Sequence, residues 1–332
     1  MTIARAEWHE ILGVLHETHR IWSVGMNRSD YQRFLELQLA HAWSRRHYRY
    51  MVSKRAGQVA SSCKLYDLGM TSRGERFRVA GVGAVFTQEK FRGTGCAGDL
   101  IDDVIELAEA EGYDGLLLYT EIGTEFYAQF GFEELGSCDV TLSAPPESVT
   151  VTPLMVPRQL TIEDVPLIAP HHTRWLRKQP YGIVRSLSYW HYKLSKESFI
   201  RRHSSLPWPT IELVLSEQSG GGYMLMEQGD STLRLIEIVG GEEARIDLWR
   251  QGLSYAGAQG ITRLRGWEAL ARDLAPGYSL NSLLPDYHAH DRSQQIHSFD
   301  REWGEPMLLA INDRLSAWTN EFPCPLLELD HC

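Results

Sequence analysis

Residues 79–132 contain the pattern that most constrains the fold of this chain. A glycine-interrupted apolar strand at 79–86 leads through a short loop into a helix. The apolar residues of that helix recur at helical spacing: Ala97, Leu100, Ile101, Val104, Ile105 and Ala108. A further apolar run at 116–119 has the composition of a strand buried on both faces. The spacing therefore predicts a strand–loop–helix–strand unit, in which Gly112 ends the helix in a left-handed conformation.

The loop between strand and helix has the features of an anion site. It reads Arg92, Gly93, Thr94, Gly95, Cys96, Ala97. A chain that enters a helix through glycines directs unpaired backbone N–H groups and the positive end of the helix dipole at one place. Arg92 adds a fixed charge with a forked donor. The loop therefore predicts a phosphate or pyrophosphate site, and we interpret Cys96 as a small residue that fits it.

Three kinds of phosphate loop compete for this stretch. Residues 93–98 read Gly-x-Gly-x-x-Gly, the pattern of dinucleotide folds, whereas the Gly-Lys-Ser/Thr of a nucleoside-triphosphate loop is absent. Arg92, Gly95 and Ala97 also fit Arg-x-x-Gly-x-Ala. The downstream sequence FYAQFGF at 126–132, with a tyrosine four residues before Gly131, favours this third pattern.

With these two motifs, residues 1–143 resemble the GNAT family of N-acetyltransferases. The resemblance implies an α/β (α+β) fold, with a mixed, mostly antiparallel central sheet flanked by helices. It implies acetyl-CoA as the co-substrate, with its pyrophosphate on the loop residues Arg92, Gly93, Thr94, Gly95, Cys96 and Ala97. It also implies that the strand residues Ala84, Val85 and Phe86 supply the oxyanion donor, and that Tyr127 protonates the leaving thiolate.

The base that removes the proton of the acceptor amine stays open. Glu121 follows the strand at 116–119 and faces the cleft of the resembled fold, and Glu125 is a second candidate. A water relay is a further route. Some tandem members of the resembled family use the C-terminal carboxylate, which here would be that of Cys332. The resemblance also brings Trp22, Tyr31 and Phe34 near the acceptor, although we interpret them as core residues.

The N-terminal part gives clear local signals. Apolar spacing predicts a helix at 7–22, and Ser29 with Gln32 predicts a capping box that opens a second helix. Strands are predicted at 47–53 and 58–66, joined by a hairpin turn at 54–57.

The second half reads as a divergent copy of the first. Residues 144–157 form a proline-containing linker, and 158–332 contain strands at 211–217, 223–227, 233–239 and 261–267 with a helix at 242–258. The strand-to-helix connection at 239–243 corresponds to the glycine loop of the first half. It has no arginine and carries Glu242 and Glu243, which would repel a pyrophosphate. We therefore predict a catalytic domain at 1–143 and a degenerate domain that shapes the acceptor cleft.

An aromatic and histidine-rich segment at 171–192 is interpreted as core. His288 and His290 have no third partner at a known ligand spacing, so we predict no metal.

Composition excludes several classes of protein. The net charge of the 332 residues is −10, and both halves are acidic, which argues against nucleic-acid binding. No apolar run approaches the roughly 20 residues that cross a membrane. Five cysteines without a CxxC pair predict a reducing, cytoplasmic location.

Two functions follow. The first is an N-acetyltransferase that passes the acetyl group of acetyl-CoA to a primary amine of a small molecule or peptide, by direct attack in a ternary complex. The alternative is an acyl-CoA-binding regulatory module without turnover. A homodimer is compatible with either.

Overall fold

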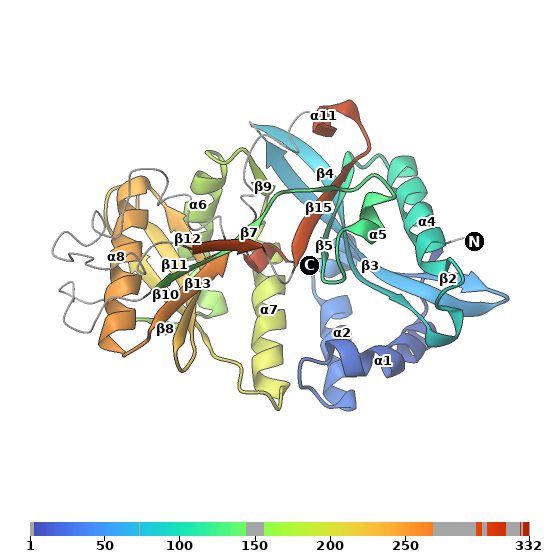
Figure 1. Cartoon of the computed structure of the whole chain (residues 1–332), viewed down its shortest axis with the longest axis horizontal. Helices are drawn as coiled ribbons and strands as arrows, with labels where there is room; N and C mark the ends of the chain where they lie inside the picture. Colours follow the sequence, from blue (N-terminus) through green and yellow to red (C-terminus); the bar gives the residue numbers. More distant parts are fainter. Residues whose placement is uncertain are drawn as a thin grey trace.

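The computed structural model describes residues 3–72, 74–143, 156–267, 297–300, 304–316, 326 and 328–331. Within this part of the chain, the strands form two sheets that helices flank (Figure 1). Most strand pairs are antiparallel, and the parallel pairs are β4 with β5 and β12 with β13. The predicted mixed α/β fold is confirmed.

The first half of the chain alternates helices and long strands. In order its elements are β1 (Ile3–Arg5), α1 (Trp8–Trp22), α2 (Arg28–Ala40), α3 (Ser44–His47), β2 (Tyr48–Arg55), β3 (Gln58–Ser72), β4 (Glu75–Thr87), η1 (Glu89–Phe91), α4 (Cys96–Ala110), β5 (Gly115–Thr120), α5 (Glu125–Ala128), β6 (Glu133–Glu134) and β7 (Cys138–Ser143).

The second half repeats the pattern of helices and strands. Its described elements are β8 (Arg158–Gln159), η2 (Ile162–Asp164), α6 (Val165–Leu176), β9 (Tyr181–Ile183), α7 (Leu187–His203), β10 (Ile211–Ser216), β11 (Gly222–Gln228), β12 (Thr232–Gly240), α8 (Glu242–Ala258), β13 (Arg263–Trp267), β14 (His297–Asp300), β15 (Glu305–Ala310), α11 (Asp313–Ser316) and η5 (Glu328–Asp330). Most of the linker predicted at 144–157 lies outside the described residues.

Local chemistry explains where the first helices begin. Glu7 precedes α1 and forms a capping box with Glu10, whose carboxylate accepts the Glu7 backbone N–H at 2.9 Å. The predicted capping box at Ser29 is wrong, because the side chain of Asn27 accepts the Asp30 backbone N–H at 2.9 Å and caps α2 two residues earlier. The hairpin between β2 and β3 turns on Ala56 and Gly57, which both have positive φ.

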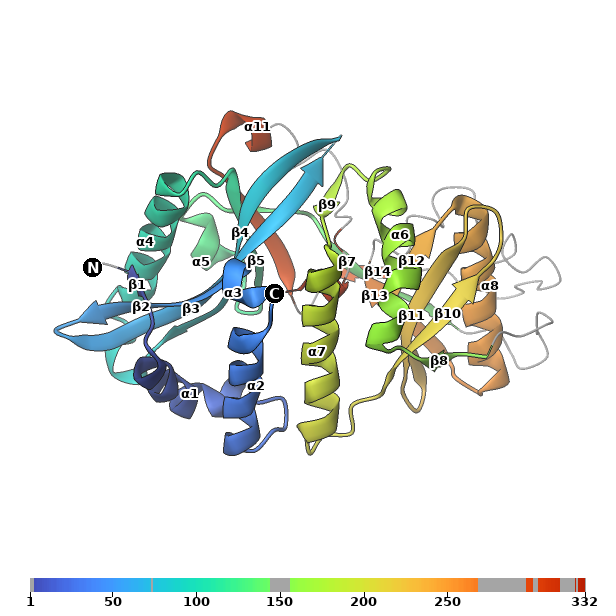
Figure 2. The same cartoon turned by 180° about the vertical axis from the view of Figure 1, so that it is seen from behind.

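The first sheet is covered on both faces. Its order is β1-β2-β3-β4-β5-β15-β6, and β9 pairs with β3. One face packs a core on α4, with Leu100, Ile101 and Val104 fully buried. The other face packs a core on α1 and α2 that extends to Tyr189 and Tyr192 of α7. Helices α2 and α7 therefore lie side by side and join the two halves (Figure 2).

The two sheets exchange a strand. β15, from the end of the chain, pairs with β5 of the first sheet, and it is the red strand beside β5 in Figure 1. β7, which precedes the linker, pairs with β13 of the second sheet. Sequence order therefore does not determine sheet membership for these two strands, and each half completes the sheet of the other.

In each sheet, two parallel strands pair over only part of their length. β4 pairs with β5 from Val79↔Gly115 to Val82↔Leu118 and then continues to Thr87 without this neighbour. β12 likewise pairs with β13 only from Thr232↔Arg263 to Leu235↔Gly266. In each case a helix, α4 or α8, connects the parallel strands. The matching β-α-β units support duplication.

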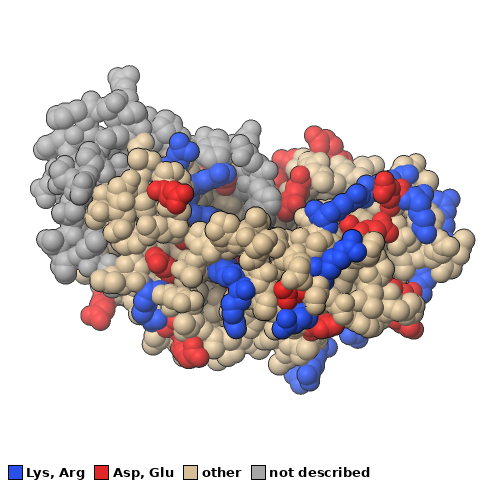
Figure 3. Space-filling view, turned by 90° about the horizontal axis from the view of Figure 1, so that it is seen from below, with Lys and Arg blue, Asp and Glu red and all other residues tan. Residues whose placement is uncertain are grey.

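The described surface carries charges of both signs. Figure 3 shows lysine and arginine interspersed with aspartate and glutamate on the face seen from below. Among the helices of the described segments, none has the length and apolar composition that a membrane span requires.

Candidate active site

The glycine loop leaves the start of α4 open. Gly93 and Gly95 have φ of +72° and +84°, so both lie in the left-handed region that favours glycine. Gly95 is the N-cap of α4, and no side chain caps the helix. A Cβ built on either glycine would meet no atom within 4 Å, so backbone conformation and not crowding requires glycine here. This open cradle fits the pyrophosphate predicted for it.

Two arginines flank the loop. The predicted Arg92 donates from Nε to the Thr87 carbonyl oxygen at 3.2 Å, and its guanidinium lies 5.7 Å from the centre of the Phe86 ring. Arg55, at the end of β2, donates to Thr94 Oγ1 at 3.1 Å. Sequence analysis missed Arg55, because the hairpin that carries it is 39 residues from the loop. Cys96 is buried at the helix start, as expected of a small residue that fits the loop.

β4 carries an irregularity where it leaves β5. The register between β3 and β4 shifts between Ser62 and Lys64, and Ala84 has a φ of +49° that few non-glycine residues adopt. The predicted oxyanion residues Ala84, Val85 and Phe86 therefore lie in the part of β4 that no longer pairs with β5. On the side away from β3, this segment has no strand neighbour in the described part of the chain.

Tyr127 is buried against the strands β3, β4 and β5. It belongs to the same core cluster as Cys63 of β3, Val82 of β4 and Leu118 of β5. Burial raises the pKa of its phenol to about 12, and the nearby Cys63 contributes. Tyr127 is therefore protonated throughout the neutral range and can serve as an acid.

The carboxylates considered as bases differ in position. Glu121 follows the last residue of β5 and is exposed, and it lines a pocket between the two halves. Glu125 is exposed at the start of α5 and does not line that pocket. Cys332, whose carboxylate is the remaining candidate on the chain itself, lies outside the described residues.

The pocket between the halves has a volume of about 440 Å³. The first half contributes Glu121 and, from the end of α1 and the turn after it, Ile21, Trp22 and Val24. α7, the segment after it and strands of the second sheet supply most of the remaining wall: Lys193, Glu197, Ile200, Arg201, Trp208, Ile211, Glu227, Arg234 and Ile236. Leu329 and His331 close it from the C-terminal segment.

Other aromatic residues singled out from the sequence lie in the core. Tyr31 and Phe34 are buried with α1 and β2, and the Tyr31 hydroxyl is 3.1 Å from Thr18 Oγ1. In the segment 171–192, the residues His172, Trp175, Tyr189, Trp190 and Tyr192 are buried. The interpretation of these residues as packing is confirmed.

In the second half, the connection between β12 and α8 corresponds to the glycine loop. Neighbouring backbone occupies the space beside its glycines. A Cβ built on Gly240 would lie 2.6 Å from the Gly221 carbonyl oxygen, and one on Gly241 would lie 2.8 Å from that of Ser219. α8 then opens with Glu242 and Glu243 in its first turn. The turn between β10 and β11 thus occupies the space that is open at Gly93 and Gly95.

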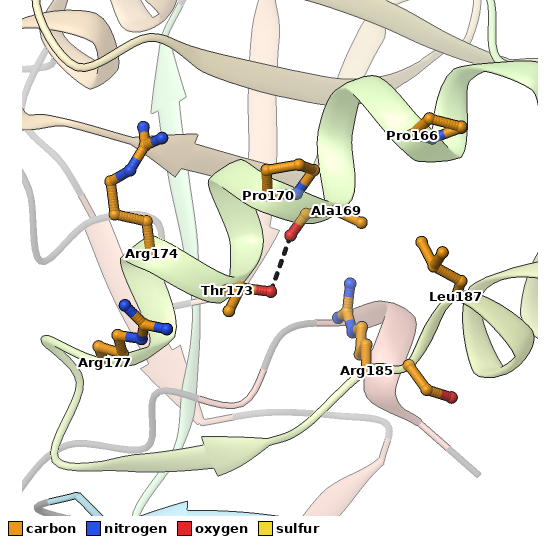
Figure 4. A pocket seen from close by; sticks show the side chains of 9 residues that line it. Pro166, Ala169, Pro170, Thr173, Arg174, Arg177, Arg185 and Leu187 are labelled. Carbon is orange, nitrogen blue, oxygen red and sulfur yellow. Dashed lines mark hydrogen bonds between the residues drawn. The ribbon is translucent and has the colours of Figure 1, made fainter.

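A larger pocket, of about 650 Å³, lies away from the glycine loop, between α6 and the start of α7. Its walls include Pro170, Thr173 and Leu187, and the Arg185 guanidinium points toward α6 (Figure 4). The charge of Arg185 is already balanced by Glu237 and Asp330. This pocket has no nucleophile or acid of the predicted chemistry.

No three histidine, cysteine, aspartate or glutamate side chains in the described ranges lie close enough together to hold a metal ion. His288 and His290, for which the sequence predicts no metal, lie outside those ranges.

Comparison with known proteins finds a family match within the first half. Residues 13–135 match the family described as the acetyltransferase (GNAT) domain. No curated protein matches the sequence. Residues 13–135 are therefore similar to a GNAT acetyltransferase domain, the class of domain that the resemblance of the glycine loop and the Tyr127 motif implied.

Solved structures extend the likeness over both halves. A GCN5-related N-acetyltransferase from Anabaena variabilis superposes with a TM-score of 0.67 at 16% identity, covering 94% of this chain and 73% of its own. One from Kribbella flavida gives 0.61 at 18% identity, with 92% and 70% coverage. Eis1 from Mycobacterium abscessus gives 0.57 at 14% identity, with 94% and 74% coverage. At these identities the likeness establishes the fold.

Proposed function

We propose that the protein is an N-acetyltransferase that transfers the acetyl group of acetyl-CoA to a primary amine of a small molecule or peptide, by direct attack in a ternary complex. One observation carries the proposal. Helix α4, which the open glycine loop begins, and Tyr127 pack in one core cluster with Val82 and Val85 of β4, next to the segment at Ala84 that does not pair with β5.

The chain's own residues have separate roles in this reaction. Arg92, Arg55 and the N–H groups at the start of α4 bind the pyrophosphate of acetyl-CoA. Acetyl-CoA supplies an acyl thioester, and backbone N–H groups near Ala84 polarise its carbonyl oxygen. Holding both substrates in one site makes the attack effectively unimolecular.

Two proton transfers complete the exchange. Glu121, directly or through a water, accepts a proton from the amine as the nitrogen–carbon bond forms. Tyr127 gives its proton to the sulfur as the carbon–sulfur bond breaks. The proton taken from the nitrogen finally replaces the one that Tyr127 has lost, so the products are an amide and a free thiol.

We also propose that only the first half binds acetyl-CoA. The sealed Gly240–Gly241 joint and the two glutamates after it support a second half that has lost the pyrophosphate site. Its remaining contribution is the wall of the pocket between the halves, formed by α7, β11 and β12.

Release of free thiol from acetyl-CoA, followed with a thiol-reactive dye against a panel of amines, tests the function. Amine-dependent release that falls in Tyr127→Phe, with a higher KM for acetyl-CoA in Arg92→Ala, supports the transferase. Binding of acetyl-CoA without release for any amine would instead indicate a regulatory module.

A further inference from the structure

The pocket between the halves is electrically balanced. It is lined by three carboxylates, Glu121, Glu197 and Glu227, by the cations Lys193, Arg201 and Arg234, and by His331. A site built for a polycation needs an excess of carboxylates, because each ammonium group that leaves water requires a counter-charge. The composition of this pocket therefore argues against an acceptor with many positive charges.

The two carboxylates from the second half are already paired. Arg201 Nη1 donates to Glu197 Oε2 at 2.5 Å, and Arg201 Nη2 pairs with Glu227 Oε1. Arg234 Nη1 donates to the other oxygen of Glu227, Oε2, at 2.8 Å. The Glu227 side chain is only 6% exposed, so replacing an arginine by an amine there would leave a buried charge without its partner.

Glu121 is the carboxylate that remains. In the described part of the chain, it takes part in no ion pair and accepts no side-chain hydrogen bond. It comes from the catalytic half, directly after β5, whose Leu118 packs in the core cluster of Tyr127. One carboxylate at this end of the pocket can pair with one ammonium group, and this places the amine near the proposed site of acetyl transfer.

The rest of the wall is apolar and partly aromatic. Trp22 lines it from the first half, and from the second half come Trp208 and the isoleucines Ile200, Ile211 and Ile236. At its edge, Ile21 and Trp208 are 48% and 37% exposed. Contact with this wall would remove apolar surface of both the amine and the protein from water, which favours binding.

Trp208 is held in place across the two halves. Its indole Nε1 donates to the Val24 carbonyl oxygen at 3.2 Å, and Val24 also lines the pocket. Arg201 Nε donates to the carbonyl oxygen of the next residue, Pro209, at 2.7 Å. The paired arginine thus positions an aromatic wall, and a rigid wall lowers the entropic cost of binding an apolar group.

We propose that the acceptor is an amphipathic monoamine: a primary amine with one positive charge and one bulky apolar group. The amine lies at Glu121, and the apolar group lies against Trp208, Trp22 and the isoleucines. The proposal rests on the acetyltransferase function argued above, since it names the class of amine for the same site. Polyamines and other polycationic amines are then poor acceptors.

The test compares 2-phenylethylamine with spermidine and with ethanolamine, which has one charge and no bulky apolar group. Thiol release gives kcat/KM, and calorimetry in the presence of CoA, which cannot react, gives the affinity of each amine. We expect 2-phenylethylamine to exceed both of the others at least tenfold in each measurement.

Variants assign the preference to the pocket. Trp208→Ala should raise the KM and the Kd of 2-phenylethylamine at least fivefold and leave the KM of acetyl-CoA unchanged, while Trp208→Phe restores most of the affinity. Trp8→Ala, at an equally exposed tryptophan outside the pocket, is the matched control and should change neither constant.

The outcomes separate this proposal from the proposed function. Selective binding of 2-phenylethylamine that Trp208→Ala weakens, without thiol release, supports the pocket class and refutes transfer. Release with spermidine or ethanolamine as good as with 2-phenylethylamine, or an unchanged Kd in Trp208→Ala, overturns the amphipathic monoamine and leaves transfer standing.

Discussion

Arg185 Nε donates to Asp330 Oδ1 at 2.7 Å, although 145 residues separate them in sequence. The same guanidinium pairs with Glu237 Oε1 of β12 at 2.7 Å, and all three side chains are at most 3% exposed. Tyr223 donates to the other Glu237 oxygen at 2.8 Å. This buried cluster ties η5 to the second sheet, and η5 is followed by His331, which lines the pocket between the halves.

Replacing Arg185 with an uncharged residue should therefore destabilise the protein. Arg185→Met leaves two buried carboxylates without their partner, and removing one member of a buried ion pair costs roughly 3–5 kcal/mol. Burial already raises the pKa of Glu237, which shows how unfavourable its charged form is there. We expect a lower free energy of unfolding in urea and a higher KM for the acceptor, because the C-terminal wall loosens.

Arg174→Met is the control for this loss. Arg174 lies on α6, and its Nη1 donates to the exposed Gly220 carbonyl oxygen at 2.7 Å without a buried carboxylate. Its replacement should cost less than about 1 kcal/mol. Equal stability of the two variants would show that the cluster does not hold the C-terminal segment.

Tyr127→Phe tests the acid of the reaction. Phenylalanine preserves the packing against Phe126 and Phe132, so stability and the KM for acetyl-CoA should change little. General acids contribute about 10²- to 10⁴-fold, and we expect kcat to fall by at least the lower value. Because the pKa of Tyr127 is about 12, the kcat of the native protein should show no alkaline loss from this group up to pH 10. An unchanged kcat in the variant would remove Tyr127 from the mechanism.

Local patterns predicted helices that carry a regular apolar face. The helix predicted at 242–258 has those bounds as α8, and Trp249, Leu253 and Ala256 of its apolar face lie in one core cluster. The helix α7 was missed, because it lies between the halves and buries residues such as Tyr189, Trp190 and Lys193 in succession around the helix. An amphipathic period is weak in a helix that packs on several sides.

Pairing between distant segments was beyond local patterns. The local sequences of β7 and β15 do not predict which sheet each strand joins, because strand pairing depends on partners far along the chain. The same limit applies to the site. The glycine loop and Tyr127 are contiguous motifs, whereas Arg55 and Trp208 reach the site only through the hairpin and the contact between halves.

Gly95→Ala tests the pyrophosphate cradle. Gly95 has a φ of +84° with open space around it, so alanine would be strained by its backbone and would not clash. A left-handed alanine costs roughly 1–2 kcal/mol. We expect a KM for acetyl-CoA at least fivefold higher, together with a weaker calorimetric affinity for CoA, because the loop relaxes away from the shape that directs its N–H groups.

Gly13→Ala is the matched control for Gly95→Ala, because both glycines have open space around a built Cβ and only Gly95 has a positive φ. Gly13 lies inside α1 with no atom within 4 Å of a built Cβ, and its φ is not positive. Alanine there should raise the free energy of unfolding by up to about 1 kcal/mol without changing either KM. A loss of CoA affinity in both variants would indicate a general effect of glycine replacement.

Lys64→Met should stabilise the protein at neutral pH. Lys64 lies opposite Gly83 in the ladder of β3 and β4, and burial lowers the pKa of its amine from 10.5 to about 8. Below pH 8 the lysine is charged in both the folded and the unfolded state, so the full cost of burying the charge is present. Between pH 8 and 10.5 the folded state loses its proton first, and this cost disappears. For a partly exposed side chain we expect a gain of roughly 1–2 kcal/mol at pH 7, since each unit of pKa shift corresponds to about 1.4 kcal/mol.

Urea denaturation of the native protein and of Lys64→Met at pH 7 and pH 10 tests this prediction. The gain in free energy of unfolding should be smaller at pH 10. A gain that is the same at both values would mean that methionine stabilises through packing and that the charge of Lys64 costs nothing.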